Sequence, residues 1–143
     1  MNTTTKPKAA YWIIAVIALI WNGMGVKAYL DQAFNSESFR AQFDTAQLAI
    51  IDNTPAWATA AFALAVFGGL LGSLTLLLRK KIANLLFTVS LLGIIVQMSY
   101  NFFISKSIEV YGPGGMIMPI MILVIGIFLF MYSKNVTTKG WLN

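Results

Sequence analysis

Four long apolar segments constrain the fold of this chain more than any other feature of its sequence. They cover residues at about 11–30, 56–78, 82–104 and 116–133. Each is close to the ~20 residues that an α-helix needs to cross the hydrocarbon core of a bilayer. Charged residues make up only 10% of the 143 residues, whereas a soluble domain has about 25%. The sequence therefore predicts a single integral membrane domain over residues 1–143, an all-α bundle of four transmembrane helices.

The polar residues 1–9, which include Lys6 and Lys8, look like the start of a secretory signal peptide. The apolar run that follows is longer than the ~7–15 residues of a signal-peptide core, and no A-x-A cleavage pattern closes it. We therefore expect a retained first transmembrane helix.

Charge is distributed unequally between the two sides that four crossings create. Seven of the ten basic residues fall on one side, and all five acidic residues fall on the other. The basic set is Lys6, Lys8, Arg79, Lys80, Lys81, Lys134 and Lys139, and the acidic set is Asp31, Glu37, Asp44, Asp52 and Glu109. Because basic residues collect in cytoplasmic loops, this bias predicts that both termini are cytoplasmic.

The outer loop, residues 31–54, is too long to be a plain connection. Apolar residues recur in it at three- and four-residue spacing, as on one face of a helix, at Phe39, Phe43, Ala46 and Ile50. Asp44 and Gln47 fit a capping box. We expect one or two short helices that lie on the outer membrane surface or cap the helix ends, with a substrate gate as the alternative. Thr54 is the expected N-cap of the next helix, with Pro55 at its first position.

Several chemistries are excluded by what the sequence lacks. It contains no Cys and no His, which removes disulfides, thiolate nucleophiles, haem histidines and the usual zinc sites. No acidic residue lies in the middle of an apolar segment, which argues against proton coupling through a buried carboxylate. The net charge of +5 sits at helix ends, so nucleic acid is not an expected partner. We predict no enzyme activity, no catalytic residue, no metal site and no cofactor.

Polar residues inside the first and third segments are the candidate ligand-binding residues. Three- and four-residue steps align one set on the first helix and another on the third. The candidates are Trp21, Asn22, Gly25, Tyr29, Gln97, Tyr100 and Asn101. If the two faces meet, the bundle contains a polar layer open to the outside. This layer either holds the helices together through interhelical hydrogen bonds or lines a cavity for a neutral polar solute such as a sugar.

The second segment carries a stripe of small residues, which we assign to helix packing. Gly68, Gly69, Gly72 and Ser73 form two overlapping small-xxx-small patterns. Such patterns let two backbones approach closely in a membrane. The sequence leaves open whether this stripe faces another helix of the same chain or a second protomer.

Three stretches of the chain resemble a small family of bacterial inner-membrane proteins. They are the run WNGMGVKAYL with Trp21-Asn22-Gly23, the run PAWATAAFALAVFGGLLGSLTLLLRKK with Pro55-Ala56-Trp57, and SYNF with Tyr100-Asn101, followed by a glycine-rich turn. The family is mostly uncharacterised, has four helices, and is often labelled "sugar transporter". The resemblance runs from Tyr11 to about Tyr132. It implies the four-helix fold, a multi-pass location in the bacterial inner membrane, and transport.

Two hypotheses for function follow. The first is a carrier or channel for a neutral polar solute, working as a homo-oligomer because four helices enclose little space. It predicts an outward-open cavity surrounded by Asn22, Gln97, Tyr100 and Asn101. The second is a structural or accessory subunit that binds another membrane protein. It predicts a packed core and an exposed small-residue stripe.

Overall fold

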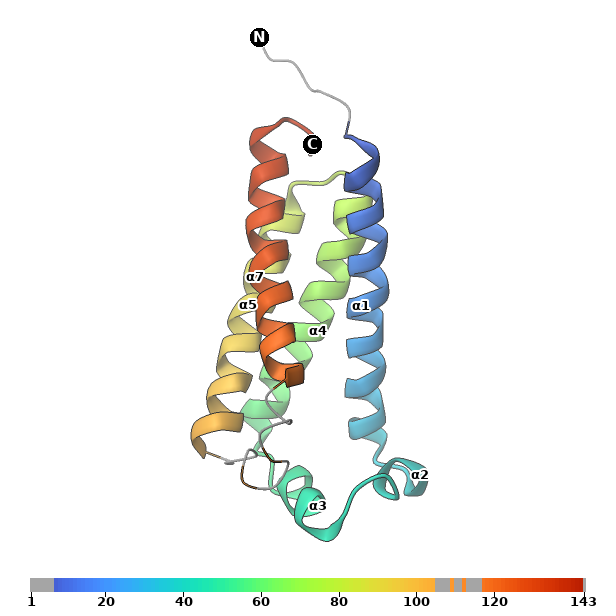
Figure 1. The fold of residues 1–143 in the computed structure, drawn as a ribbon, viewed down its shortest axis with the longest axis vertical. Helices are drawn as coiled ribbons and strands as arrows, with labels where there is room; N and C mark the ends of the chain where they lie inside the picture. The colour runs from blue at the N-terminus through green and yellow to red at the C-terminus, as the bar shows by residue number, and fades with distance from the viewer. Residues whose placement is uncertain (1–6, 105–108, 110–111, 113–116, 143) are drawn as a thin grey trace.

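The computed structural model describes residues 7–104, 109, 112 and 117–142. Its long elements are the helices α1 (Ala9–Phe34), α4 (Ala56–Leu77), α5 (Ile82–Ser99) and α7 (Ile117–Thr138). A short π-helix, η1 (Tyr100–Ile104), continues α5. All four long units are apolar enough to cross a membrane (Figure 1). The predicted four-helix membrane fold is confirmed, and the described residues form no strand.

The helix bounds differ from the predicted ones mainly at the ends of α1 and α7. The helix α1 continues beyond the expected end at residue 30, because its polar last turn suits a helix that has left the bilayer. It stops at Asn35, whose left-handed φ of 53° places its N–H 3.0 Å from the Asp31 carbonyl. The helix α7 likewise passes the expected residue 133. The glycine-rich turn expected before α7 lies mostly outside the described residues.

The start of α4 corrects one prediction. Pro55 is the N-cap residue, with extended φ and ψ of −72° and 160°. Thr54 instead donates its hydroxyl to the Ile50 carbonyl at 2.9 Å. The Thr54 side chain therefore belongs to the end of the preceding short helix, and it cannot cap α4 at the same time.

The helix α4 is the centre of the bundle, because it packs against both α1 and α5, and α5 packs in turn against α7. The α4–α5 interface brings the two backbones together. A Cβ built on Gly93 would lie 2.7 Å from the Ala61 carbonyl oxygen and 2.8 Å from the Ala65 nitrogen. A Cβ on Gly68 would lie 3.1 Å from the Leu86 carbonyl oxygen. Small residues thus set this spacing, as expected where no hydrophobic effect drives helices together.

One end of the bundle is closed by aromatic side chains. The Tyr11 ring is fully buried and meets the ring of Trp141 edge-on at 5.7 Å. The Tyr11 hydroxyl donates to the Leu76 carbonyl, and Arg79 Nε donates to the Trp141 carbonyl at 2.9 Å. A positive φ of 78° at Gly140 turns the chain back so that Trp141 covers the helix ends. These contacts fix α1, α4 and the segment after α7 to one another.

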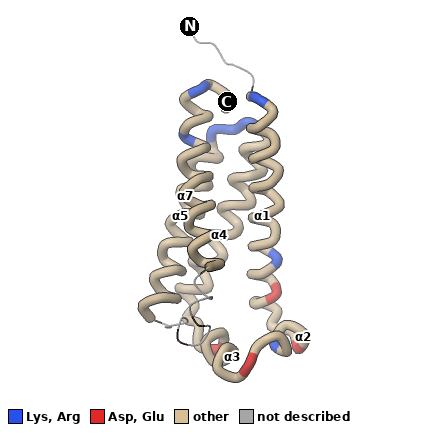
Figure 2. Tube along the Cα trace, in the orientation of Figure 1, with Lys and Arg blue, Asp and Glu red and all other residues tan. Residues whose placement is uncertain are grey.

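Charge is segregated between the two ends of the bundle, as the sequence predicted. Figure 2 shows that most lysines and arginines gather at the closed end and that the acidic residues lie toward the other, where Lys27 and Arg40 pair with Asp31 and Asp52. The start of α1, the α4–α5 turn and the end of α7 share the closed end (Figure 1).

The opposite end carries the expected helical cap, as two helices, α2 (Glu37–Arg40) and α3 (Thr45–Asp52). The predicted capping box is confirmed. Gln47 N donates to Asp44 Oδ1 at 2.8 Å, and Asp44 N donates to Gln47 Oε1 at 3.1 Å. The rings of Phe39 and Phe43 meet at 5.1 Å. The regularly spaced apolar residues between 39 and 50 therefore belong to two helices and the turn between them, and do not form the face of a single helix.

Candidate binding cavities

The long helices line a partly open pocket of about 310 Å³, here called the central cavity. All four contribute to its wall. The lining includes Trp21, Asn22 and Gly25 from α1, Val66 and Gly69 from α4, Ser90 and Ile94 from α5, and Ile122 and Gly126 from α7. Small residues on α1, α4 and α7 leave the space that these side chains surround.

The lining of this cavity is apolar apart from the Trp21 indole, the Asn22 amide and the Ser90 hydroxyl. Ser90 donates its only hydroxyl hydrogen to the Ala65 carbonyl at 2.6 Å. Asn22 Nδ2 donates to the Ala18 carbonyl at 2.9 Å and to Ser73 Oγ at 3.2 Å. Hydrogen-bond donors in the lining are therefore largely used within the bundle.

On one side the cavity is bounded by the line along which α1 and α7 face each other, here called the seam. These helices meet at the closed end, where the rings of Tyr11 and Tyr132 lie 6.3 Å apart. Toward the other end they stand apart (Figure 1), and the extended packing joins α1 to α4, α4 to α5, and α5 to α7. Met24 on α1 and Met118 on α7 line the cavity and are 63% and 56% exposed. The seam therefore faces the region that lipid occupies.

The structure brings together only some of the predicted ligand-binding residues. Trp21, Asn22 and Gly25 line the central cavity, whereas Gln97, Tyr100 and Asn101 are not in its lining. Because α4 lies between α1 and α5, the amide of Asn22 meets Ser73 rather than the third crossing. The buried Tyr100 ring packs edge-on against Trp57 at 5.4 Å instead. The expected polar layer between the first and third crossings is not formed.

The small-residue stripe of α4 is buried within the chain's own bundle. A Cβ on Gly68 or on Gly72 would meet α5, the latter at 2.9 Å from the Phe87 ring. Gly69 and Ser73 face α1 through Asn22. The stripe therefore packs, as predicted, against other helices, and these are α5 on one side and α1 on the other side, both from the same chain.

A second, outer pocket of about 240 Å³ lies between the end of α1, the helix α3 and the start of α4. Most of its lining residues carry a polar group, although apolar atoms form about half of the wall, and they include the predicted residue Tyr29. The lining residues are Tyr29, Gln32, Ala33, Asn35, Ile51, Asp52, Thr54 and Thr59. No periodic pattern in the sequence predicts this pocket, because its walls come from the ends of three separate elements.

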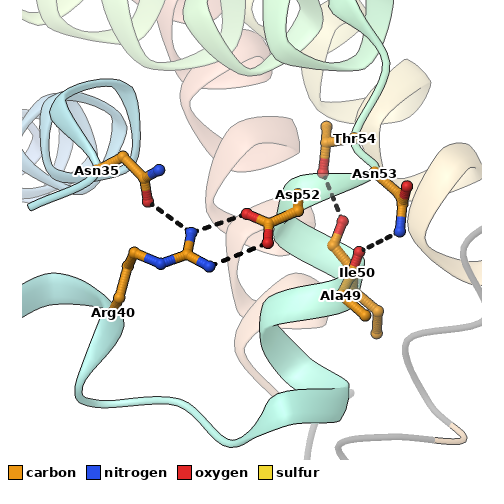
Figure 3. Close-up of polar contacts among 7 residues, drawn as sticks. All are labelled: Asn35, Arg40, Ala49, Ile50, Asp52, Asn53 and Thr54. Atoms are coloured by element: carbon orange, nitrogen blue, oxygen red, sulfur yellow. Dashed lines mark hydrogen bonds and ion pairs between the residues drawn. The ribbon is translucent and has the colours of Figure 1, made fainter. Parts of the chain in front are cut away.

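An ion pair holds the wall of the outer pocket in place (Figure 3). Arg40 donates from its two terminal nitrogens to the two carboxylate oxygens of Asp52 at 2.8 and 3.0 Å. It also donates to Asn35 Oδ1 at 3.1 Å. The hydrogen bonds from Arg40 lower the pKa of Asp52 below its usual value. The guanidinium thus ties α2 to both α3 and the end of α1.

The described residues contain no group of three or more Asp, Glu, His or Cys side chains that could hold a metal ion. No family model, no curated protein and no solved structure matches this chain. The resemblance to inner-membrane proteins stays a prediction. The fold itself shows a multi-pass membrane protein. Its described residues line an apolar central cavity and an outer pocket of mixed polarity.

Proposed function

We propose that this small membrane protein binds a mostly apolar molecule in its central cavity and admits it from the bilayer between α1 and α7. The observation that carries the proposal is the lining, which is apolar on all four helices apart from one amide, one hydroxyl and one indole. The volume of about 310 Å³ lies at the lower end of the ~300–1,000 Å³ range of ligand pockets. It suits a small molecule or one segment of a longer chain.

This cavity is poorly suited to a sugar, the solute expected from the resemblance. Each hydroxyl moved from water into an apolar site without a partner costs at least ~1–3 kcal/mol. A sugar carries several hydroxyls, and the donors of Asn22 and Ser90 are already used. An apolar molecule pays no such cost and fills the space by contact with the lining.

A second candidate, binding of a neutral polar solute, is supported by the outer pocket. Gln32, Thr54 and Thr59 bring an amide and two hydroxyls to its wall. The Asp52 charge is offset by Arg40, so the wall favours no ion strongly. Single substitutions of Gln32 and Thr59 to Leu that leave solute binding unchanged would contradict this candidate.

We also propose that the closed, basic end is cytoplasmic and that the outer pocket faces the outside of a bacterial inner membrane. The charge segregation in Figure 2 supports this orientation through the positive-inside rule. The accessory-subunit hypothesis finds less support, because the stripe that it needs to expose is buried between α1 and α5.

Photo-crosslinking tests the central cavity. A hydrocarbon carrying a diazirine is added to membranes that contain the protein, and the labelled residues are mapped by peptide mass spectrometry. We expect saturable labelling around Ile122 and Ile125, which line the cavity. The Ile122→Trp variant should lose this labelling, because the larger side chain fills the central cavity. The matched Ile120→Trp variant, changed on an exposed face of α7, should retain it.

Two results would overturn the proposal. One is labelling confined to exposed positions of α7 such as Ile120 and Val124. The other is cavity labelling that Ile122→Trp and Ile120→Trp leave equally intact.

A further inference from the structure

The hydrogen bonds around Asn22 leave one polar atom of that side chain available to a ligand. Both hydrogens of Nδ2 are used, on the Ala18 carbonyl and on Ser73 Oγ. The oxygen Oδ1 accepts no hydrogen bond from the described residues. This oxygen is not fully buried either. Among the described side chains, the buried polar atom that lacks a hydrogen-bond partner is Asn84 Oδ1 and not Asn22 Oδ1.

The orientation of the amide is fixed by its neighbours on α4. Ser73 donates its own hydrogen to the Gly69 carbonyl at 2.8 Å, so its oxygen can only accept from Asn22. The amide nitrogen therefore points to Ser73, and the oxygen lies over Gly69, another lining residue. An amide turned the other way would place two acceptors, Oδ1 and the Ala18 carbonyl oxygen, against each other. The Asn22 side chain therefore offers its acceptor Oδ1 to the cavity, whereas both Nδ2 hydrogens are already bonded within the bundle.

The one hydroxyl among the described lining residues, that of Ser90, leads to the same result. Ser90 gives its hydrogen to the Ala65 carbonyl, so only its oxygen lone pairs remain. The Trp21 indole N–H is the one side-chain donor in the described lining that makes no hydrogen bond. Within the residues described, the polar part of the cavity therefore offers two acceptors, Asn22 Oδ1 and Ser90 Oγ, and one free donor, the Trp21 indole.

From this we infer that the ligand is a neutral amphiphile with an apolar body and a hydrogen-bond donor, such as the hydroxyl of a fatty or isoprenoid alcohol, which donates to Asn22 Oδ1. This inference rests on the proposed function and specifies its substrate class. A carboxylate has no hydrogen to donate and would leave an unpaired charge in an apolar site. A ketone, ester or hydrocarbon of the same length cannot make the bond.

Competition against the hydrocarbon photoprobe tests this class. Octanol, octanone and octane are compared at matched membrane concentrations, and loss of label from Ile122 is measured. A net hydrogen bond of about 1 kcal/mol predicts that octanol displaces the probe at roughly fivefold lower concentration than octanone or octane. In the Asn22→Leu variant the three competitors should become equal while the probe still labels Ile122.

A second variant keeps the test decisive if Asn22→Leu packs poorly. Ser73→Ala frees one Nδ2 hydrogen and should let octanone approach the potency of octanol. The matched Ser99→Ala variant also removes a hydroxyl that donates to a carbonyl one turn back, that of Ile95. Ser99 lies outside the cavity lining, so this variant should leave the relative potencies of the three competitors unchanged. Trp21→Phe removes the remaining donor and should preserve or widen the preference for octanol.

The outcomes separate the two proposals. Equal competition by all three compounds in the unsubstituted protein, with Ile122 labelled, overturns the alcohol inference and leaves the apolar cavity standing. Preference for octanol that survives Asn22→Leu also overturns it. Absence of label from the cavity overturns the proposed function itself.

Discussion

The amide oxygen of Asn22 lies in the space that a side chain at Gly69 would need. A Cβ built on Gly69 would be 2.0 Å from Asn22 Oδ1 and 2.6 Å from its Cγ. The polar side chain on α1 is thus accommodated by the missing side chain on α4, and Ser73 completes its hydrogen bonding one turn away. The glycine at position 69 serves the Asn22 site as well as helix packing.

The Gly69→Ala variant should be destabilised by about 1–3 kcal/mol, the usual cost of overpacking a close interface. Asn22 would have to rotate and give up its bonds to Ala18 and Ser73. Thermal unfolding in detergent measures the change. Gly23→Ala is the control, because a Cβ there meets nothing within 4 Å. Equal stability of the two variants would contradict the contact, and adding Asn22→Ala to Gly69→Ala should recover part of the loss.

Gly93→Ala should be worse than Gly126→Ala, although both glycines lie at interfaces. At Gly93 the new methyl group would meet the backbone of α4 at 2.7 and 2.8 Å, so the helices must separate. At Gly126 it would meet the end of the Ile94 side chain at 2.8 Å, which can rotate away. The midpoint of unfolding in detergent should fall clearly for Gly93→Ala and little for Gly126→Ala. The reverse order would refute the close α4–α5 packing.

The closed end should depend on Trp141. Removing the ring in Trp141→Ala leaves a cavity beside Tyr11, and truncation of a buried Trp costs about 3–5 kcal/mol. Faster proteolysis after Lys139 and a lower unfolding midpoint are expected. The Trp12→Ala variant loses a ring that is 39% exposed and should have the smaller effect. If both variants behave alike, the ring of Trp141 does not hold this end together.

The ion pair between Arg40 and Asp52 should respond to acid. Because the pKa of Asp52 is lowered in the folded chain, the contact is complete at neutral pH and is lost as pH falls through that lowered value, below about pH 4. In Arg40→Gln the pKa of Asp52, followed by carboxyl NMR, should move up toward its ordinary value. Lys27→Gln, which breaks the exposed pair with Asp31, should leave it unchanged. No shift in Arg40→Gln would show that the pair does not form.

Single cysteines can check both orientation and cavity chemistry in this chain without native cysteine. In intact cells a charged, impermeant thiol reagent should label Gln32→Cys in the outer pocket. It should not label Asn135→Cys, which is exposed near the closed end. Asn22→Cys should be labelled slowly, because its surroundings are apolar. Rapid labelling at Asn22 would indicate a water-filled cavity, and labelling at Asn135 alone would reverse the orientation.

The sequence predicted the fold well because length and hydropathy fix membrane helices with little help from tertiary contacts. The capping box at Asp44 and Gln47 was also predictable, since it depends on residues three apart. The pairing of helices was not. Periodicity places Asn22 on a face of α1, but it does not say whether Ser73 or Gln97 lies opposite. That choice depends on the packing of α1 against α4, which no local pattern encodes.

The order of helix packing has a consequence for biogenesis. Each extended interface joins crossings that are consecutive in the chain, first α1 with α4, then α4 with α5, then α5 with α7. Each helix can therefore dock as it enters the bilayer, without waiting for a later one. The helix α7 supplies the last wall of the central cavity, so this cavity is complete only after the final crossing has docked.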